Sequence, residues 1–330
     1  MDAVDVPFGA AFFIVLNCGS GRKDVLATRE TIAQVLSAAG REHHIEVVTD
    51  AKRLPEIARD TVARAKAANG VVVAAGGDGT INAMAQATLG SGCLFAVLPQ
   101  GTFNYFSRTH GISSDAEQAT RLLLTCRAHP VQVGLINERV FLVNASLGLY
   151  PQLLQDREAY KRQYGRSRLV ALAAAIVTLF KDHRQMRLRI EEDGRSRELR
   201  TPTLFVGNNR LQMEQVGIPQ APRLDEGELA AVAIKPVGTL ALLWLLARGA
   251  LSRLGDADNV IHFSFRSITV TSRSKAASRR GAKVATDGEV VWMKPPLRFA
   301  VAPQPLLLIK PEPGPDHVDP DSAGEPEASP

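Results

Sequence analysis

Cysteine and aromatic residues are scarce in this chain of 330 residues. It contains only three cysteines, Cys18, Cys93 and Cys126, and neither their odd number nor their spacing matches a metal or redox motif. Few cysteines predict a reducing compartment, and therefore a cytoplasmic protein. Aromatic residues make up 5% of the sequence and do not alternate with the basic stretches, which argues against nucleic acid as a partner.

A basic leader and long apolar runs are also missing. Residues 1–5 carry acids where a signal peptide carries positive charge. The apolar segment 240–247 ends at Arg248 and is shorter than the roughly 20 apolar residues that a spanning helix needs. We interpret it as a core helix, with peripheral docking on the inner face of an anionic membrane as the alternative. The net charge of +5 fits an anionic substrate, membrane or nucleic acid without choosing between them.

What the chain does contain, over its first third, is an alternation of strand-like and helix-like segments. Apolar runs predict strands at 12–16, 44–48, 71–75 and 94–98, and periodic segments predict helices at 25–39, 55–68 and 80–89. Such alternation implies right-handed crossovers and a doubly wound, mostly parallel sheet. We therefore predict an α/β nucleotide-binding domain over residues 8–130.

The pattern changes near residue 131. Short strands separated by Gly, Asn and Asp turns predict an antiparallel, β-rich substrate domain over residues 131–303. Its expected strands are 131–133, 140–144, 186–190, 204–207, 229–234, 268–271 and 290–292, with helices at 168–180 and 239–254. Residues 304–310 are expected to return to the first domain as a strand at 306–310. Residues 311–330 have almost no apolar side chains, and we expect a disordered tail.

A glycine turn, Gly76-Gly77-Asp78-Gly79-Thr80, follows the third predicted strand and opens a helix. Glycines allow a ligand to approach the backbone closely, and a helix N-terminus attracts phosphate oxygens. The turn has neither the lysine of a Walker A loop nor the spacing of a dinucleotide fingerprint. Alone, it could equally be a tight turn without a ligand.

Two more polar glycine turns follow neighbouring strands, at 17–21 and 99–104. Ligands of a doubly wound sheet lie beyond the carboxyl ends of its strands, so we expect the three turns to face one crevice. Near the other end of the chain, Asp287-Gly288 lies between two strand-like segments and predicts a hairpin turn.

These motifs resemble the diacylglycerol kinase catalytic superfamily, which includes bacterial lipid kinases, sphingosine kinases and ceramide kinase. The resemblance spans roughly residues 10–310 and rests on Gly76 to Thr80 with Asn82, and on Pro99-x-Gly101-Thr102-x-Asn104. Asn144-x-Ser146-x-Gly148, Gly207-Asn208-Asn209 and Asp287-Gly288-Glu289 add to it. It implies an α/β nucleotide domain and a β-sandwich domain with the active site between them.

The resemblance also implies the roles of individual residues. The residues expected to bind ATP are Asn17, Thr49, Gly76, Gly77, Asp78, Gly79, Thr80, Asn82, Gly101, Thr102 and Asn104. The expected catalytic residues are Asp287 as base, Glu289 close by, and Asp78 as the residue that positions Mg²⁺ through water. An acidic turn with Asp225, Glu226 and Glu228 is expected to lie near a metal, although Glu226 replaces the usual aspartate.

The implied activity is ATP-dependent phosphorylation of diacylglycerol or a related lipid alcohol. Many lipid kinases of this superfamily carry an acid where this chain has Ala83 and Tyr105, and a change there bears on the choice of acceptor. A kinase of a soluble alcohol, such as a nucleotide or sugar, and a non-catalytic nucleotide-binding regulator are the alternatives. A homodimer is left open.

Overall fold

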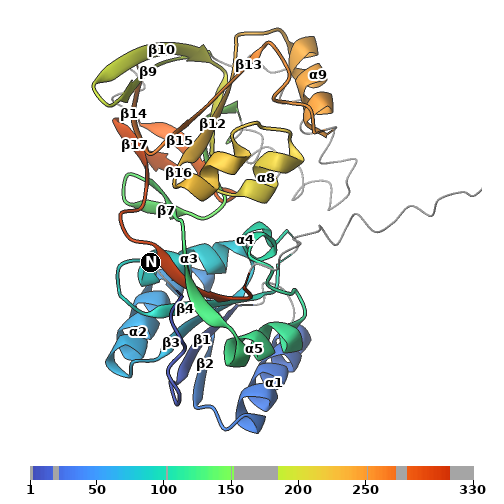
Figure 1. The fold of residues 1–330 in the computed structure, drawn as a ribbon, viewed down its shortest axis with the longest axis vertical. Coiled ribbons are helices and arrows are strands. Elements are labelled where there is room, and N and C mark those ends of the chain that lie inside the picture. Colours follow the sequence, from blue (N-terminus) through green and yellow to red (C-terminus); the bar gives the residue numbers. More distant parts are fainter. Residues whose placement is uncertain are drawn as a thin grey trace, which may run out of the picture.

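A computed structural model describes residues 3–17, 22–101, 103–149, 151, 185–250, 252–272 and 281–312. The described chain forms two parts, one above the other in Figure 1. The predicted helix at 168–180 lies outside the described residues, as does the predicted tail from residue 313 onward. Among the described residues, no helix is long and apolar enough to cross a membrane.

The first part is built on a six-stranded sheet with the order β2-β1-β3-β4-β18-β5. Every pairing in it is parallel except that of β5 with β18. Its strands are β1 (Phe12–Asn17), β2 (His43–Val47), β3 (Val71–Gly76), β4 (Leu94–Pro99), β5 (Arg127–Val131) and β18 (Leu306–Lys310). Strands β3 and β4 are buried along their whole length because helices cover both faces of the sheet, which explains their continuous apolar runs.

Helices form a layer on each face of this sheet (Figure 1): α1 contacts α5, and α2 contacts α3. Their bounds are α1 (Arg22–Ala38), α2 (Leu54–Ala67), α3 (Asp78–Thr88), α4 (Tyr105–Thr109) and α5 (Ala116–Thr125), with a short 3₁₀ turn η1 (Ala51–Arg53) before α2. The α3 helix begins two residues earlier than predicted, because Gly77 is its N-cap and Asp78 is already helical. The glycine turn is therefore tighter than the sequence indicated.

The second part contains two antiparallel six-stranded sheets. One has the order β10-β9-β14-β17-β6-β7 and consists of β6 (Gly134–Ile136), β7 (Arg139–Phe141), β9 (Met186–Glu192), β10 (Arg195–Thr201), β14 (Ser267–Ser272) and β17 (Leu297–Val301). The other has the order β13-β12-β11-β8-β15-β16 and consists of β8 (Asn144–Gly148), β11 (Thr203–Gly207), β12 (Leu229–Ile234), β13 (Val260–Phe265), β15 (Ala282–Thr286) and β16 (Glu289–Met293).

A shared core joins these two sheets, with Phe141 and Phe299 from one sheet and Leu204 and Val284 from the other. Three helical segments, α8 (Arg210–Gln215), η2 (Ala221–Glu226) and α9 (Thr239–Ala250), accompany the second sheet. The fold class is thus confirmed: a mostly parallel α/β part is followed by an antiparallel β-rich part. The predicted helix 239–254 ends early, at Ala250.

Two predicted strands near the junction of the parts are wrong. Residues 131–133 are not one strand, because β5 ends at Val131 and the chain then crosses to the second part. Residues 140–144 are not one strand either, because β7 ends at Phe141 and β8 begins at Asn144. The bend at Leu142 and Val143 aims consecutive backbone N–H groups at a carboxylate from a distant hairpin, which is described below.

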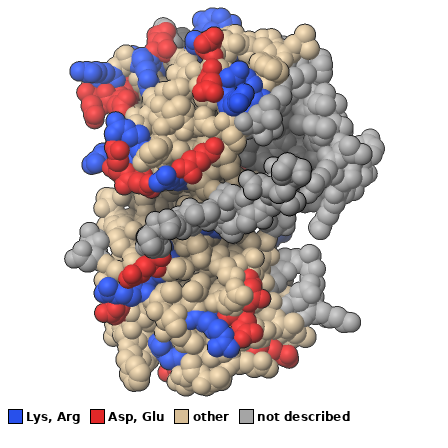
Figure 2. Space-filling view, turned by 45° about the vertical axis from the view of Figure 1, so that its right-hand side comes forward, with Lys and Arg blue, Asp and Glu red and all other residues tan. Residues whose placement is uncertain are grey.

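Charged side chains of both signs are interspersed on the molecular face seen in Figure 2. The described chain forms several exposed ion pairs, such as Arg189 with Glu191 and Arg121 with Glu117. Exposed pairs of this kind contribute little to stability, with a median of about 0–1 kcal/mol. The arrangement is that of a solvated surface.

Candidate active site

The carboxyl ends of β1, β3 and β4 lie side by side, since Asn17 pairs with Gly76 and Gly76 pairs with Pro99. The two glycine turns that follow β3 and β4 touch each other. A Cβ on Gly101 would lie 3.1 Å from the Cα of Gly77. The predicted shared edge is thus confirmed for the turns after β3 and β4, while residues 18–21 of the third predicted turn lie outside the described residues.

Gly76 has no room for a side chain. A Cβ there would lie 2.8 Å from the carbonyl oxygen of Asn17 and 2.8 Å from Thr80 Oγ1. Asn17 Nδ2 in turn donates to Thr80 Oγ1 over 2.9 Å, so the predicted binding residues Asn17 and Thr80 bind each other. This contact ties the end of β1 to the first turn of α3.

The N-terminus of α3 carries no side-chain cap, because its N-cap is Gly77. The first N–H groups of a helix have no partner within the helix, and they favour anions. Next to them, the turn after β4 is held by Asn104, whose side chain accepts from Gly101 N over 3.1 Å and donates to Gly101 O over 2.9 Å. Asn104 adopts a left-handed conformation, with φ of 47°. Both turns thus present backbone groups and little side-chain bulk.

Asp78 lies at the centre of this edge with one buried oxygen atom, Oδ1, that has no hydrogen-bond partner in the described part of the chain. Burial raises the pKa of Asp78, while backbone N–H groups of Asn104 and of Asp78 itself oppose that rise. A cation would give Oδ1 the partner that it lacks. Mg²⁺ takes one or two protein carboxylates and keeps several waters, so Asp78 fits Mg²⁺ as a ligand or through water.

Three more residues were predicted to bind the nucleotide: Thr49, Thr102 and Asn82. Thr49 is exposed just beyond the end of β2, which is separated from β3 by β1. Thr102 lies outside the described residues. Asn82 lies one turn into α3. Its side chain is hydrogen-bonded to the second part of the molecule and is therefore not free to bind a nucleotide at the glycine turns.

The Asp287-Gly288 pair forms the predicted two-residue hairpin turn between β15 and β16. Both residues have positive φ, 47° and 88°, as a type I′ turn requires. The Asp287 carboxylate accepts four hydrogen bonds: from the backbone N of Leu142 at 2.7 Å, Val143 at 2.9 Å and Asn144 at 2.9 Å, and from Asn82 Nδ2 at 2.7 Å. Burial raises the pKa of Asp287, and these four donors oppose that rise. These bonds hold the chain where it bends between β7 and β8.

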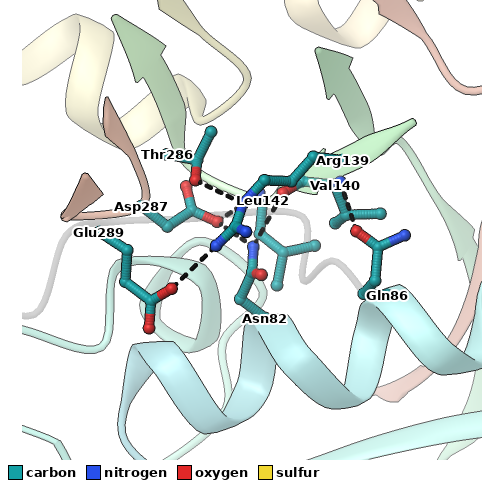
Figure 3. A network of polar contacts seen from close by, with 8 residues as sticks. All are labelled: Asn82, Gln86, Arg139, Val140, Leu142, Thr286, Asp287 and Glu289. Atoms are coloured by element: carbon teal, nitrogen blue, oxygen red, sulfur yellow. Dashed lines mark hydrogen bonds and ion pairs between the residues drawn. The ribbon is translucent and has the colours of Figure 1, made fainter. Parts of the chain in front are cut away.

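Asn82 and Gln86, on one face of α3, dock that helix against the second part (Figure 3). Asn82 Nδ2 also donates to the Val140 carbonyl at 3.1 Å. Gln86 donates to the Glu138 carbonyl at 3.1 Å and accepts from Val140 N at 2.8 Å. Sequence reasoning missed Gln86, although its spacing of four residues from Asn82 places both on the same side of a helix.

Glu289 follows the hairpin turn and reaches the first turn of α3. A Cβ on Gly79 would lie 3.3 Å from Glu289 Oε1. The other oxygen, Oε2, accepts from Arg139 Nη2 at 2.8 Å. The structure therefore brings Asp78, Gly79 and Glu289 together, although they come from different parts of the molecule. Arg139 was missed from the sequence, where it is one of many arginines.

The carboxylates of the acidic turn, which were predicted to lie near a metal, form ion pairs with arginines. Arg210 binds Asp225, and Arg223 binds Glu226 and lies 3.9 Å from Glu228. Among the described residues, no three His, Cys, Asp or Glu side chains gather closely enough to hold a metal. Two arginines, Arg210 and Arg223, are thus shared among these three carboxylates, and a metal at this turn stays a prediction.

A separate cavity of about 630 Å³ lies where both parts meet, near the end of α4 and the start of α8. It is lined by Gln132, Asn208, Arg210, Asp225 and Lys310, among others. Burial lowers the pKa of Lys310, and the charge of Asp225 opposes that effect. The cavity wall thus contains the acidic turn, but not the glycine turns.

Comparison with known proteins shows which family the chain belongs to. The family model of the diacylglycerol kinase catalytic domain matches residues 11–136. "Probable lipid kinase YegS-like" from Pseudomonas aeruginosa PAO1 is 30% identical over 286 residues, which cover 83% of this chain and 86% of that protein. The chain belongs to the diacylglycerol kinase family.

Two other relatives match over shorter stretches, and a solved structure matches over nearly the whole chain. A diacylglycerol kinase of Bacillus subtilis 168 is 30% identical over 146 residues, 43% of this chain and 47% of its own length. The chain spans 46% of a YegS-like protein from Cronobacter sakazakii, at 32% identity. The crystal structure of a diacylglycerol kinase from Bacillus anthracis Sterne matches with a TM-score of 0.64 at 19% identity. The match covers 92% of this chain and 97% of the Bacillus anthracis chain. That likeness concerns the fold of the diacylglycerol kinase family, over nearly the whole chain.

Proposed function

We propose that this protein is an ATP-dependent lipid kinase, which transfers the γ-phosphoryl group to a hydroxyl of diacylglycerol or a related lipid alcohol. One observation carries the proposal. The carboxylate of Glu289, from the second part, lies beside Gly79 at the uncapped N-terminus of α3, from the first part. A group that can take a proton is thus held next to backbone groups that can bind phosphate.

Phosphoryl transfer depends mainly on positioning and on neutralising the charge of the moving group. The α3 N-terminus and the turns at Gly77 and Gly101 would hold the phosphate oxygens of ATP, with little bulk to keep them away. Asp78, through its unpaired Oδ1, would hold Mg²⁺. Bound Mg²⁺ would supply positive charge for the phosphate oxygens.

Of the two carboxylates near the hairpin, we assign the base role to Glu289. Both oxygens of Asp287 already accept hydrogen bonds from four N–H groups, so Asp287 acts by holding the turn and α3 in place. Glu289 has a 60% exposed side chain and can reach an acceptor. The acceptor oxygen forms a bond to the γ-phosphorus, its proton passes to Glu289, and the bond from the γ-phosphorus to the bridging oxygen breaks, which leaves ADP.

A lipid acceptor is supported by the family and by one surface feature. Leu240 and Trp244, one turn apart on α9, have exposed fractions of 79% and 63%. Leu242 and Leu245 of the same helix are buried, so α9 is both a core helix and an exposed apolar stripe. Side chains of this kind bind at the boundary between lipid head groups and acyl chains. We therefore propose peripheral membrane contact through α9.

The decisive experiment incubates the purified protein with radiolabelled ATP, Mg²⁺ and mixed micelles that contain diacylglycerol, with a parallel panel of sugars and nucleosides. We expect labelled phosphatidic acid or another labelled lipid phosphate. If the label appears only in a soluble alcohol, the acceptor is that alcohol and not a lipid. ATP binding without transfer to any acceptor would favour a non-catalytic regulator. Glu289→Gln serves as the control, with a strongly reduced but still measurable rate of transfer.

A further inference from the structure

We propose that Arg139 is a positioning residue, which holds the Glu289 carboxylate at the N-terminus of α3. The inference deepens the proposed function and depends on it for the role of Glu289. Arg139 is the first residue of β7, on the strand that α3 packs against. It touches neither glycine turn in the contacts of the described residues, so its effect on the reaction passes through Glu289.

The guanidinium of Arg139 joins the two residues that close the hairpin. Thr286 and Glu289 are paired directly across the turn that contains Asp287 and Gly288. Arg139 Nε donates to Thr286 Oγ1 at 3.0 Å, and Nη2 donates to Glu289 Oε2 at 2.8 Å (Figure 3). Thr286 is buried, with 2% exposure, so it is a fixed anchor for the arginine.

Burial and rotational freedom explain why Glu289 needs such a partner. Its side chain is 60% exposed, whereas that of Arg139 is 33% exposed. A free glutamate at the end of a hairpin samples several rotamers, and ordering such a long side chain costs conformational entropy. The ion pair holds one oxygen, Oε2, and leaves Oε1 beside Gly79. Arg139 thus orders the carboxylate while leaving one of its oxygens for the acceptor.

Gly79 provides the space that this orientation needs. A Cβ at that position would lie 3.3 Å from Glu289 Oε1, which is closer than an ordinary van der Waals contact. The two hydrogen bonds, to Thr286 and to Glu289, also require an arginine at position 139. Its planar fork directs Nε and Nη2 to two different acceptors, whereas a lysine offers a single ammonium group.

A double-mutant cycle tests whether Arg139 acts through Glu289. We expect Arg139→Met to lower kcat roughly 10- to 100-fold, as loss of orientation of a catalytic base would, with KM for ATP changed less than about twofold. In a Glu289→Gln background, Arg139→Met should lower kcat no further. Equal losses in both backgrounds would overturn the proposal. Arg139→Lys should retain an intermediate kcat.

Matched controls separate positioning from folding. Arg189→Met removes a similar arginine–glutamate pair, Arg189 with Glu191, on β9, which three strands separate from β7 in the same sheet, and should leave kcat unchanged. Urea unfolding midpoints of all variants show whether a loss of kcat is a loss of folded protein. A kcat loss in Arg139→Met that follows its folded fraction would contradict the positioning role.

Crystal structures distinguish this inference from the proposed function. We expect Glu289 beside Gly79 in the wild type and turned away from it in Arg139→Met. An unchanged Glu289 in the variant would overturn the positioning role, whatever the activity. If the wild type transfers phosphate to no acceptor, the proposed function fails, while the structural comparison still decides whether Arg139 orients Glu289.

Discussion

The side-chain amide of Asn82 donates to Asp287 Oδ2 over 2.7 Å, and the two residues are 205 positions apart in the chain. Asn82 belongs to α3, whose N-terminus borders the glycine turns, and Asp287 belongs to the hairpin that carries Glu289. This hydrogen bond fixes α3, at whose N-terminus we propose that phosphate binds, against the hairpin of the second part. In the proposed reaction, this bonded turn sets the distance from Glu289 to the phosphate.

Asp287→Ala should destabilise the protein strongly. It would leave three backbone N–H groups and the Asn82 amide without their acceptor, and each buried unpaired group costs about 1–3 kcal/mol. Urea unfolding would measure the loss, and Asp287→Asn should be less destabilising because one oxygen acceptor remains. If Asp287→Asn unfolds at the wild-type midpoint but has no turnover, Asp287 rather than Glu289 is the base.

Gly101→Ala should weaken ATP binding by roughly tenfold or more, because the new methyl group would lie 2.7 Å from Asn104 Oδ1 and 3.1 Å from Gly77 Cα. The two turns would have to separate, and their backbone groups would no longer converge. Calorimetric titration with ATP and Mg²⁺ measures the change. Gly238→Ala is the matched control, since no atom lies within 4 Å of a Cβ at that position. Equal affinities of the two variants would argue against a phosphate site at Gly101.

Asp78→Asn should reduce the effect of Mg²⁺ on ATP binding while ATP binding without metal changes little. The neutral amide keeps the shape of the side chain but is a much poorer ligand for Mg²⁺ than a carboxylate. Titrations of ATP with and without Mg²⁺ measure both quantities. An undiminished Mg²⁺ effect in the variant would show that Asp78 does not hold the metal.

His110 should make the protein less stable in acid. Burial, helped by the charge of Lys310, lowers the pKa of His110 from 6.5 to about 3. Between these values the unfolded chain binds a proton that the folded protein does not, so stability falls as pH decreases, by at most about 1.4 kcal/mol per pH unit. Above pH 6.5 the group contributes no pH dependence.

Thermal unfolding at pH 7.5 and 4.5 tests this linkage. The decrease in Tm between the two conditions should be smaller in His110→Gln than in the wild type, because glutamine does not titrate. The difference between the two proteins isolates His110 from carboxylates such as Asp287, whose raised pKa acts in the opposite direction. Equal decreases in Tm for the two proteins would contradict the burial of a neutral His110.

Trp244→Glu should weaken binding to anionic vesicles about tenfold, because a buried aromatic side chain contributes about 1.5–3 kcal/mol and the new charge adds repulsion. Sedimentation with vesicles of phosphatidylglycerol and phosphatidylcholine measures the partition. Trp292→Glu is the control, since Trp292 has a similar exposed fraction, 64% against 63%, but lies on β16. Unchanged binding by Trp244→Glu would rule out contact through α9.

The sequence alone determined the local features whose causes are local. The strands β3 and β4 were predicted because a parallel strand covered on both faces must be a continuous apolar run. The Asp287-Gly288 turn was predicted because its two positive φ angles suit this pair. The shared edge of the glycine turns followed from strand direction alone.

Only the tertiary structure decided how those features act on one another. The bend at Leu142 and Val143 depends on the Asp287 carboxylate, more than 140 residues away, and no local propensity encodes it. Arg139 orients Glu289, and Arg210 pairs with Asp225 of the acidic turn, because chain topology brings these charges together. The sequence gives the sign of each side-chain charge, but which charges pair is decided only when distant segments pack together.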